Sequence, residues 1–250
     1  MQRRIPLEGC HNFRDLGGYP TAGGARLRWR RLFRADGLQD LTQADVRALL
    51  EEIRLSDVVD LRSSAELELD GRGRLQHEAG VRFHHLPLFD GRRGPVPPGR
   101  DAAPALRRDW TLAQMYLGML ETATAPIARV ISALAEADRA AVFHCAAGKD
   151  RTGIISALLL ALLDVPEEII VADYAATKET LDAIVARLNR SRGYDRVWED
   201  LPPDTLHAEP KTMLDFLAGL QQSYGGARGY ARAIGLSDAV LARLVESCVE

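Results

Sequence analysis

A cysteine and an arginine, six positions apart in one short loop, are the residues of this chain best placed to do chemistry. The stretch reads VFHCAAGKDRTG and carries the thiol of Cys145 and the guanidinium of Arg151. An apolar run precedes the loop and a longer one follows it, which predicts a strand, the loop and then a helix. The first turn of a helix offers unpaired amide hydrogens and the positive end of the helix dipole, and anions bind there. The pattern therefore predicts an anion site beside a thiol.

The residues between the thiol and the guanidinium suit a tetrahedral anion. Ala146, Ala147 and Gly148 are small enough for successive backbone amides to curve around it, and Arg151 can bind two of its oxygens in one planar contact. A thiol ionises more readily beside a helix N-terminus and fixed cations, so we expect Cys145 to attack a bound phosphorus as a thiolate. This predicts phosphoryl transfer through a phosphocysteine intermediate. The alternative is a buried, inert cysteine that ends a core strand.

Two other kinds of loop fit the stretch less well. A nucleotide-binding P-loop needs Gly well before Gly-Lys and then Ser or Thr, whereas Phe143 and Asp150 occupy those two positions. A sulfur carrier of the rhodanese type also places a cysteine ahead of a helix. Such a carrier has no evident need for Arg151 together with Lys149 and Asp150.

The bulk composition is that of a soluble globular protein. The chain has 250 residues, 46% of them hydrophobic and 27% charged, with a net charge of −3, and it can bury a full core. This charge does not indicate a nucleic-acid partner. The three cysteines lack metal-ligand spacing, so we expect no metal and no other cofactor. The longest apolar run, 154–163, is too short to span a membrane, and the N-terminus lacks a secretory signal pattern, so we expect a cytoplasmic protein with no integral membrane segment.

Arginines are nonetheless concentrated in two segments. One lies near the N-terminus and the other precedes the middle of the chain: Arg26, Arg28, Arg30, Arg31 and Arg34, and Arg92, Arg93, Arg100, Arg107 and Arg108. Each segment is either a solvated surface or a means of attracting anionic substrates.

The order of the expected elements indicates an α/β fold. Strands are expected at RLFRAD, DVVDLR, VRFHHLPLF and AAVFHC. Helices are expected at 42–53, 110–121, 126–137, 151–163, 164–174, 179–188, 210–222, 227–234 and 237–249. Interleaved strands and helices predict a mainly parallel sheet, in a single domain over 1–250. Prolines and glycines disfavour regular structure over 91–108, so we expect a flexible loop or lid element there.

The loop resembles the signature of cysteine-dependent tyrosine and dual-specificity phosphatases, and more narrowly that of bacterial tyrosine and lipid phosphatases with HCxxGKDRTG. Further segments match that family in order: NFRDLGGY (12–19), RLFRAD (31–36), DVVDLRSSAE (57–66), LPLFD (86–90), IVADYAATKE (170–179) and YGGARGYARAIGLS (224–237). The resemblance implies a central, mainly parallel twisted sheet flanked by helices on both faces. Its members include secreted phosphatases, so secretion without a signal sequence is an alternative to a cytoplasmic location.

The resemblance also implies roles for individual residues. Cys145 would be the nucleophile and Arg151 the phosphate clamp, and the Thr152 hydroxyl would steady the departing thiolate. Asp90, at the end of LPLFD, falls where the family places an acid that protonates the leaving oxygen and then activates water. From the residues alone, Asp90 could equally belong to a plain Asp-Gly turn. The segment after it lacks helical character before Trp110, so a helical lid is in doubt.

Asp150 and Lys149, inside the loop, each have two readings. Asp150 competes with Asp90 as the acid, but flanking cations favour the ionised carboxylate, which suits a base or a structural anchor better. Lys149 would either face a second phosphate, as in inositide phosphatases with Gly-Lys in this loop, or compensate the charge of Asp150.

Several residues are expected to support the pocket. His144 precedes the nucleophile on a strand, so its side chain points to the opposite face, and we expect it to position the loop through hydrogen bonds rather than to act as a base. Asn12, Arg14 and Asp15 are expected to support the pocket as well. Arg34, Asp60 and Arg62 suggest a buried ion network near the strand ends.

The sequence therefore predicts a cysteine-dependent phosphatase. The expected substrates are phosphotyrosine proteins, with phosphoserine, phosphothreonine and phosphoinositides as additional candidates. One alternative is a phosphoinositide phosphatase with little protein activity, and another is a module that binds phosphorylated ligands without turnover. The oligomeric state, monomer or dimer, stays open.

Overall fold

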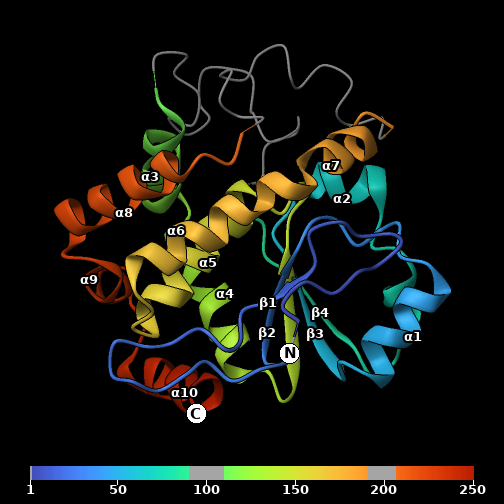
Figure 1. Cartoon of the computed structure of the whole chain (residues 1–250), viewed down its shortest axis with the longest axis horizontal. Helices are drawn as coiled ribbons and strands as arrows, with labels where there is room; N and C mark the ends of the chain where they lie inside the picture. The colour runs from blue at the N-terminus through green and yellow to red at the C-terminus, as the bar shows by residue number, and fades with distance from the viewer. Residues whose placement is uncertain (1, 90–109, 191–206) are drawn as a thin grey trace.

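A central sheet organises the chain, as a computed structural model that describes residues 2–89, 110–190 and 207–250 shows (Figure 1). In the described residues its strand order is β1-β2-β5-β3-β4. The strands are β1 (Arg14–Asp15), β2 (Leu32–Ala35), β3 (Leu55–Asp60), β4 (Arg82–His85) and β5 (Ala140–His144). Only β1 runs antiparallel to its neighbour, β2, and the other pairs are parallel. The predicted mainly parallel sheet is confirmed.

The parallel register brings three strand ends to one edge of the sheet. His144, the last residue of β5, lies opposite Ala35 of β2 on one side and Asp60 of β3 on the other. Because parallel strands end at the same edge, the segments that begin at Asp36, Leu61 and Cys145 start side by side. This carboxyl edge is where ligands bind in open α/β sheets.

Helices cover both faces of the sheet, as predicted. On one face α1 (Gln43–Glu51) packs Val46 and Leu49 against Phe33 and Val58, and Figure 1 shows α1 on the side of the strands away from α4 and α5. A capping box starts α1: the Thr42 side chain accepts from an amide in the first turn, which satisfies an otherwise unpaired donor. Because helices cover both faces of the sheet, the parallel strands β2, β3 and β5 are buried throughout.

The other face carries most of the helices (Figure 1). They are α3 (Leu112–Thr122), α4 (Thr124–Glu136), α5 (Asp150–Leu162), α6 (Glu167–Ala175), α8 (Pro210–Tyr224), α9 (Ala227–Ala233) and α10 (Asp238–Cys248). Helix α5 is buried on nearly every side, as its uniformly apolar sequence predicts. These bounds agree with the predicted helices to within a few residues.

Two helical segments differ from the prediction. The expected helix at 179–188 is a 3-10 turn, Ala176–Thr180, followed by α7 (Leu181–Leu188). Helix α2 (Ser64–Asp70) was not predicted, although its capping box, with Ser63 and Glu66 exchanging hydrogen bonds, can be read in the sequence SSAE. A short 3-10 turn, Arg74–His77, follows α2.

Three expectations lie outside the described residues: the acid Asp90, the loop or lid element over 91–108, and the second arginine segment, which comprises Arg92, Arg93, Arg100, Arg107 and Arg108. The single domain over 1–250 stays a prediction. Within the described ranges no helix has both the length and the apolar character needed to cross a membrane.

Candidate active site

The cysteine loop connects β5 to α5 at the carboxyl edge of the sheet. Cys145 follows the last residue of β5, and only 2% of it is exposed. Helix α5 begins at Asp150, with Lys149 at the N-cap position and no side chain capping the first amides. Because a helix start leaves several N–H groups unpaired, these amides remain for an anion. The predicted strand, loop and helix are therefore in place around the thiol.

Gly148 lets the loop turn tightly against β2. Its φ of +65° lies in the left-handed region, which other residues adopt at a cost. A Cβ at this position would lie 2.5 Å from the Ala35 carbonyl oxygen and 2.6 Å from the Asp36 nitrogen. No side chain fits there, so the close approach of the loop to β2 requires glycine.

Arg151 is held by a buried carboxylate from α2. Its Nη1 donates to Oε2 of Glu66 at 2.6 Å and its Nη2 to Oε1 at 2.8 Å, a bidentate pair. The Phe89 ring centroid lies 4.9 Å from the Arg151 Cζ. These contacts set the plane of the guanidinium in the first turn of α5, as a bidentate phosphate contact requires. Sequence reasoning missed Glu66; the capping box that contains it was the available signal.

Lys149 and Asp150 form an ion pair that two tyrosines complete. The Lys149 Nζ lies 2.7 Å from Oδ1 of Asp150, and only 2% of the lysine side chain is exposed. Tyr116 donates to the same oxygen at 2.6 Å, and its hydroxyl lies 2.8 Å from that of Tyr174. Burial alone would lower the pKa of Lys149, but Asp150 outweighs it and the pKa is raised. Of the two predicted readings, the observed contact is charge compensation.

His144 is a buried neutral residue behind the loop. Burial lowers its pKa to about 4, so its imidazole is uncharged at neutral pH and keeps one N–H. Its Nδ1 lies 3.3 Å from the Cys145 carbonyl oxygen and its Nε2 lies 3.8 Å from Oδ2 of Asp60. Burial would raise the pKa of Asp60, yet His144 and Arg62 hold it well below its usual range. These contacts reach the loop backbone, which is the arrangement expected of a positioning histidine.

The Thr152 hydroxyl is buried in the first turn of α5 and has no hydrogen-bond partner among the residues the structure describes. Buried hydroxyls are ordinarily paired. This unpaired hydroxyl directly follows Arg151 in the sequence and is available for a further hydrogen bond.

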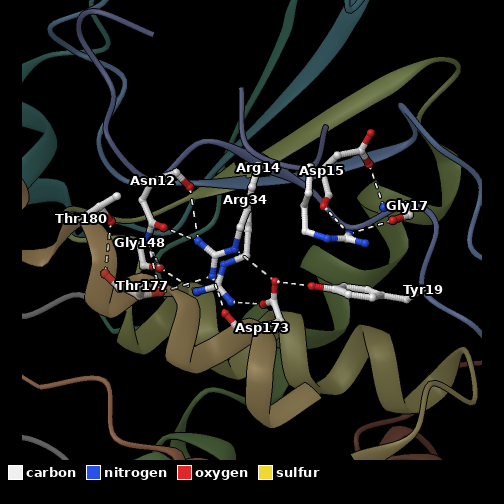
Figure 2. A network of polar contacts seen from close by, with 11 residues as sticks. Asn12, Arg14, Asp15, Gly17, Tyr19, Arg34, Gly148, Asp173, Thr177 and Thr180 are labelled. Atoms are coloured by element: carbon white, nitrogen blue, oxygen red, sulfur yellow. Dashed lines mark hydrogen bonds and ion pairs between the residues drawn. The ribbon is translucent and has the colours of Figure 1, made fainter. Parts of the chain in front are cut away.

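A network of polar contacts from the N-terminal segment reaches the loop at Gly148, as Figure 2 shows. The Asn12 side chain donates to the Gly148 carbonyl at 3.2 Å, and Arg34 of β2 donates to the same oxygen at 2.7 Å. Asp173 of α6 pairs with Arg34 at 2.5 Å and with Arg14 at 3.1 Å. Burial would raise the pKa of Asp173, but the two arginines keep it well below its usual range.

Asp15 lies elsewhere. Its carboxylate accepts from the backbone amides of Gly17 and Arg30, each at 2.7 Å, and not from the loop. The structure therefore brings Asn12 to the loop directly and Arg14 through Asp173, while Asp15 shapes a nearby turn. The predicted ion network of Arg34, Asp60 and Arg62 is present as two separate pairs, since Arg34 pairs with Asp173 and Arg62 with Asp60.

A second arginine, which sequence reasoning missed, reaches the loop from α7. Arg187 donates to the Ala146 carbonyl oxygen, which also accepts from the Gly37 amide at 3.0 Å. Its Nη2 lies 3.3 Å from Oδ2 of Asp36. No local pattern pointed to Arg187, because its partners lie far from it in the sequence.

Comparisons with known proteins agree with this geometry. The profile of a family described as "Tyrosine phosphatase family" matches residues 5–250. The chain is 30% identical to the triple specificity protein phosphatase PtpB of Mycobacterium tuberculosis, over 95% of this chain and 96% of that protein. It is 37% identical to a putative tyrosine-protein phosphatase of Cupriavidus necator, over 70% of this chain and 63% of that one.

Two further likenesses are more limited. The chain is 39% identical to a tyrosine-protein phosphatase of Nostoc commune over 44% of its length and 39% of that protein. A solved structure of the Siw14 catalytic core aligns with 82% of the chain and 90% of that structure, at 14% identity and a TM-score of 0.38.

Proposed function

The chain belongs to the tyrosine phosphatase family, and on that premise we propose that it hydrolyses phosphate monoesters through a phosphocysteine intermediate. The observation that carries the proposal is the loop itself. A thiol at the end of β5, an uncapped helix start and the bidentate Arg151–Glu66 pair meet at one edge of the sheet. Such an arrangement binds a phosphate dianion and presents a nucleophile to its phosphorus.

The proposed first step transfers the phosphoryl group to sulfur. The Cys145 thiolate attacks phosphorus, an S–P bond forms, and the bond from phosphorus to the ester oxygen breaks. A general acid donates a proton to the departing oxygen. Arg151 and the loop amides bind the equatorial oxygens, where negative charge is stabilised in the transition state.

The proposed second step releases inorganic phosphate. Water attacks phosphorus after giving a proton to the base, an O–P bond forms, and the S–P bond breaks to return the thiolate. The buried Thr152 hydroxyl, unpaired within the described part of the chain, supplies a hydrogen bond to the departing sulfur.

We assign the acid to Asp90 in preference to Asp150. Phe89, the neighbour of Asp90 in the sequence, contacts the Arg151 guanidinium. Asp150 instead accepts from Tyr116 and pairs with Lys149 through one oxygen, so its carboxylate is already bound to neighbours in the protein. Asp150 thus suits an anchor for the loop.

The proposed substrates are phosphotyrosine proteins, with phosphoserine, phosphothreonine and phosphoinositides as additional candidates. The alternative of a phosphoinositide phosphatase with little protein activity depends on Lys149 meeting a second phosphate. Its ammonium is buried and paired with Asp150, so we favour protein substrates. Lys149→Ala, assayed on phosphotyrosine peptide and on inositide lipid, separates the two, because the alternative predicts a selective loss of activity on the lipid.

We propose a cytoplasmic location for the protein, with secretion without a signal sequence as the alternative.

The test compares three variants across pH on a phosphotyrosine peptide: Cys145→Ser, Asp90→Ala and Asp150→Ala. We expect Cys145→Ser to abolish turnover while the protein still binds phosphate. We expect Asp90→Ala to remove the basic limb of the pH–rate profile, and Asp150→Ala to reduce turnover without removing it. Unchanged turnover and pH profile in Asp90→Ala would refute the acid assignment. Turnover that persists in Cys145→Ser would refute the proposed function.

A further inference from the structure

Two buried arginines outside the loop contact its backbone carbonyls, Arg34 from β2 and Arg187 from α7. We propose that both are positioning residues of the active site, which turn and polarise the loop amides toward the bound phosphate. The inference rests on the proposed function, because it assigns the two arginines to the same phosphate-binding loop.

The first contact is made by Arg34, whose side chain is fully buried. Its Nη2 donates to the Gly148 carbonyl at 2.7 Å, while its Nη1 pairs with Oδ2 of Asp173 at 2.5 Å. Figure 2 shows that Arg14 and Arg34 both point toward Asp173. The carboxylate thus holds Arg34 in the orientation that reaches Gly148.

The second contact repeats this plan with different residues. Arg187, which is also buried, donates to the Ala146 carbonyl, and Oδ2 of Asp36 lies 3.3 Å from the same nitrogen, Nη2. The other oxygen of Asp36 accepts from the His11 amide at 3.0 Å and from the Asn12 amide at 2.8 Å. An aspartate again anchors an arginine that binds a loop carbonyl.

The two carbonyls that the arginines bind, those of Ala146 and Gly148, are separated by one residue of the loop. In a trans peptide the carbonyl and the following N–H point in opposite directions. Carbonyls of Ala146 and Gly148 that face the arginines therefore direct the amides of Ala147 and Lys149 the other way, toward the anion position. A cation on the carbonyl also polarises that peptide and strengthens its N–H as a donor. Donors oriented before the substrate arrives need no reorganisation during the reaction.

Arg34 carries its charge at neutral pH. Burial lowers the pKa of Arg34 to about 10, with Arg14 adding to the shift, while Asp173 and the Cys145 thiolate oppose it. Among the residues that the structure describes, other titratable and charged groups near the loop include Lys149, Asp150, Arg151, Glu66, His144, Asp60, Asp36, Tyr116 and Tyr174.

Arg187 is poorly suited to a purely structural role. Its Nε and Nη1 are buried and make no hydrogen bond with any residue that the structure describes, and its ion pairs are loose: Nη1 lies 3.8 Å from Oδ2 of Asp40, and Nη2 lies 3.3 Å from Oδ2 of Asp36. Buried polar atoms are ordinarily satisfied, and replacing a buried ion pair by apolar groups is often neutral for stability. Incomplete pairing retained at a functional site indicates that the arginine serves the loop.

The test uses Arg34→Met and Arg187→Met, with Arg31→Met as the matched control. Arg31 is another buried arginine that donates to backbone carbonyls, including that of Ala137 at 2.6 Å, but it lies at the opposite edge of the sheet. For each full-length variant we would measure kcat and KM for an aryl phosphate, the inhibition constant of vanadate, and Tm.

Because removing one oriented donor costs about 10²–10³ in kcat, we expect each of the two loop variants to lose at least about tenfold in kcat and in vanadate affinity. Arg31→Met should keep both within about twofold, whatever its Tm. The conservative variants Arg34→Lys and Arg187→Lys should recover part of the vanadate affinity. If either methionine variant fails to fold, its lysine variant and Asp173→Asn, which loosens Arg34, should show smaller losses of the same kind.

The outcomes separate the inference from the function on which it rests. If the wild-type protein neither hydrolyses the aryl phosphate nor binds vanadate, the proposed function is wrong. If the wild type does both and folded Arg34 and Arg187 variants keep its kcat and vanadate affinity within twofold, the positioning role is wrong. Equal losses in Arg31→Met would also overturn it, because they would trace the effect to general stability.

Discussion

The two edges of the sheet use arginine in opposite ways. At the carboxyl edge Arg34, Arg62, Arg151 and Arg187 are buried, and each pairs with an aspartate or glutamate. At the amino edge a cavity of about 680 Å³ is lined by Arg28, Arg30, Arg31, Arg54, Arg139 and Arg243, with Glu52, Asp138 and Glu246 among them. Most of these side chains are exposed, and 45% of the Arg28 side chain is accessible.

The two edges therefore differ in how their arginines are held and not in how many they have. At the carboxyl edge, where we propose the active site, the arginines are buried and paired with carboxylates. The N-terminal arginine segment divides between the two roles. Arg34 alone in that segment reaches the loop, while Arg28 and Arg30 bind backbone carbonyls on the solvent-facing edge. An exposed cation is screened by solvent and salt; a buried one acts on its neighbours through a lower dielectric.

The largest expected effect comes from the arginine that meets the substrate. Arg151→Lys keeps the charge but loses the planar bidentate contact, so we expect kcat to fall by about 10²–10³. Steady-state kinetics on an aryl phosphate measure this. Arg54→Lys at the amino edge is the matched control and should keep wild-type kinetics. A kcat for Arg151→Lys within tenfold of wild type would contradict a specific bidentate role.

A second prediction concerns acid stability at the carboxyl edge. The folded pKa of His144 is depressed from 6.5 to about 4. Below pH 6.5 the unfolded chain therefore binds a proton that the folded chain rejects, so stability falls as pH drops from 6.5 toward 4. A shift of this size corresponds to about 3 kcal/mol in the free energy of unfolding.

Urea unfolding at several pH values tests this prediction. His144→Asn should lose about 3 kcal/mol less than wild type between pH 7 and pH 4. His77, exposed in a 3-10 turn, is the control, and His77→Asn should follow the wild-type curve. Parallel curves for His144→Asn and wild type would show that His144 does not resist protonation in the folded state.

The smallest effect is expected at the amino edge. Arg54 and Arg139 are exposed, and the described residues provide neither with an ion pair. Since surface substitutions of this kind change stability by about 0.5 kcal/mol or less, Arg54→Glu with Arg139→Glu should leave Tm and kcat close to wild type. A large loss of activity on a phosphotyrosine peptide would show that exposed arginines at the amino edge also contribute to catalysis or substrate binding, which contradicts the proposed difference between the two edges.

The parts of the site that could be predicted from the sequence are those whose residues lie close together along the chain. Cys145 and Arg151 share one loop, and small residues, spacing and the following apolar run suffice to predict a strand, a loop and a helix. The sheet followed from interleaved apolar segments, and α2 could have been found from Ser63 and Glu66. These features depend on neighbours in the chain.

The missed parts depend on contacts between distant segments. Arg34 and Gly148 are separated by 114 positions and Arg151 and Glu66 by 85, and no pattern in one sequence says which carbonyl or carboxylate a buried arginine will meet. The same holds for Lys149: the resemblance to inositide phosphatases with Gly-Lys in this loop suggested a second phosphate, but its ammonium instead pairs with Asp150, around which Tyr116 and Tyr174 pack.

The most direct test of the account traps the covalent intermediate. Wild-type protein is mixed with an excess of an aryl phosphate, quenched in acid within the first turnovers, digested and examined by mass spectrometry. The account predicts one added phosphoryl group on the peptide that contains Cys145, and its absence in Cys145→Ser. A phosphoryl group on another residue, or rapid turnover with no phosphorylated peptide at any quench time, would contradict a phosphocysteine mechanism.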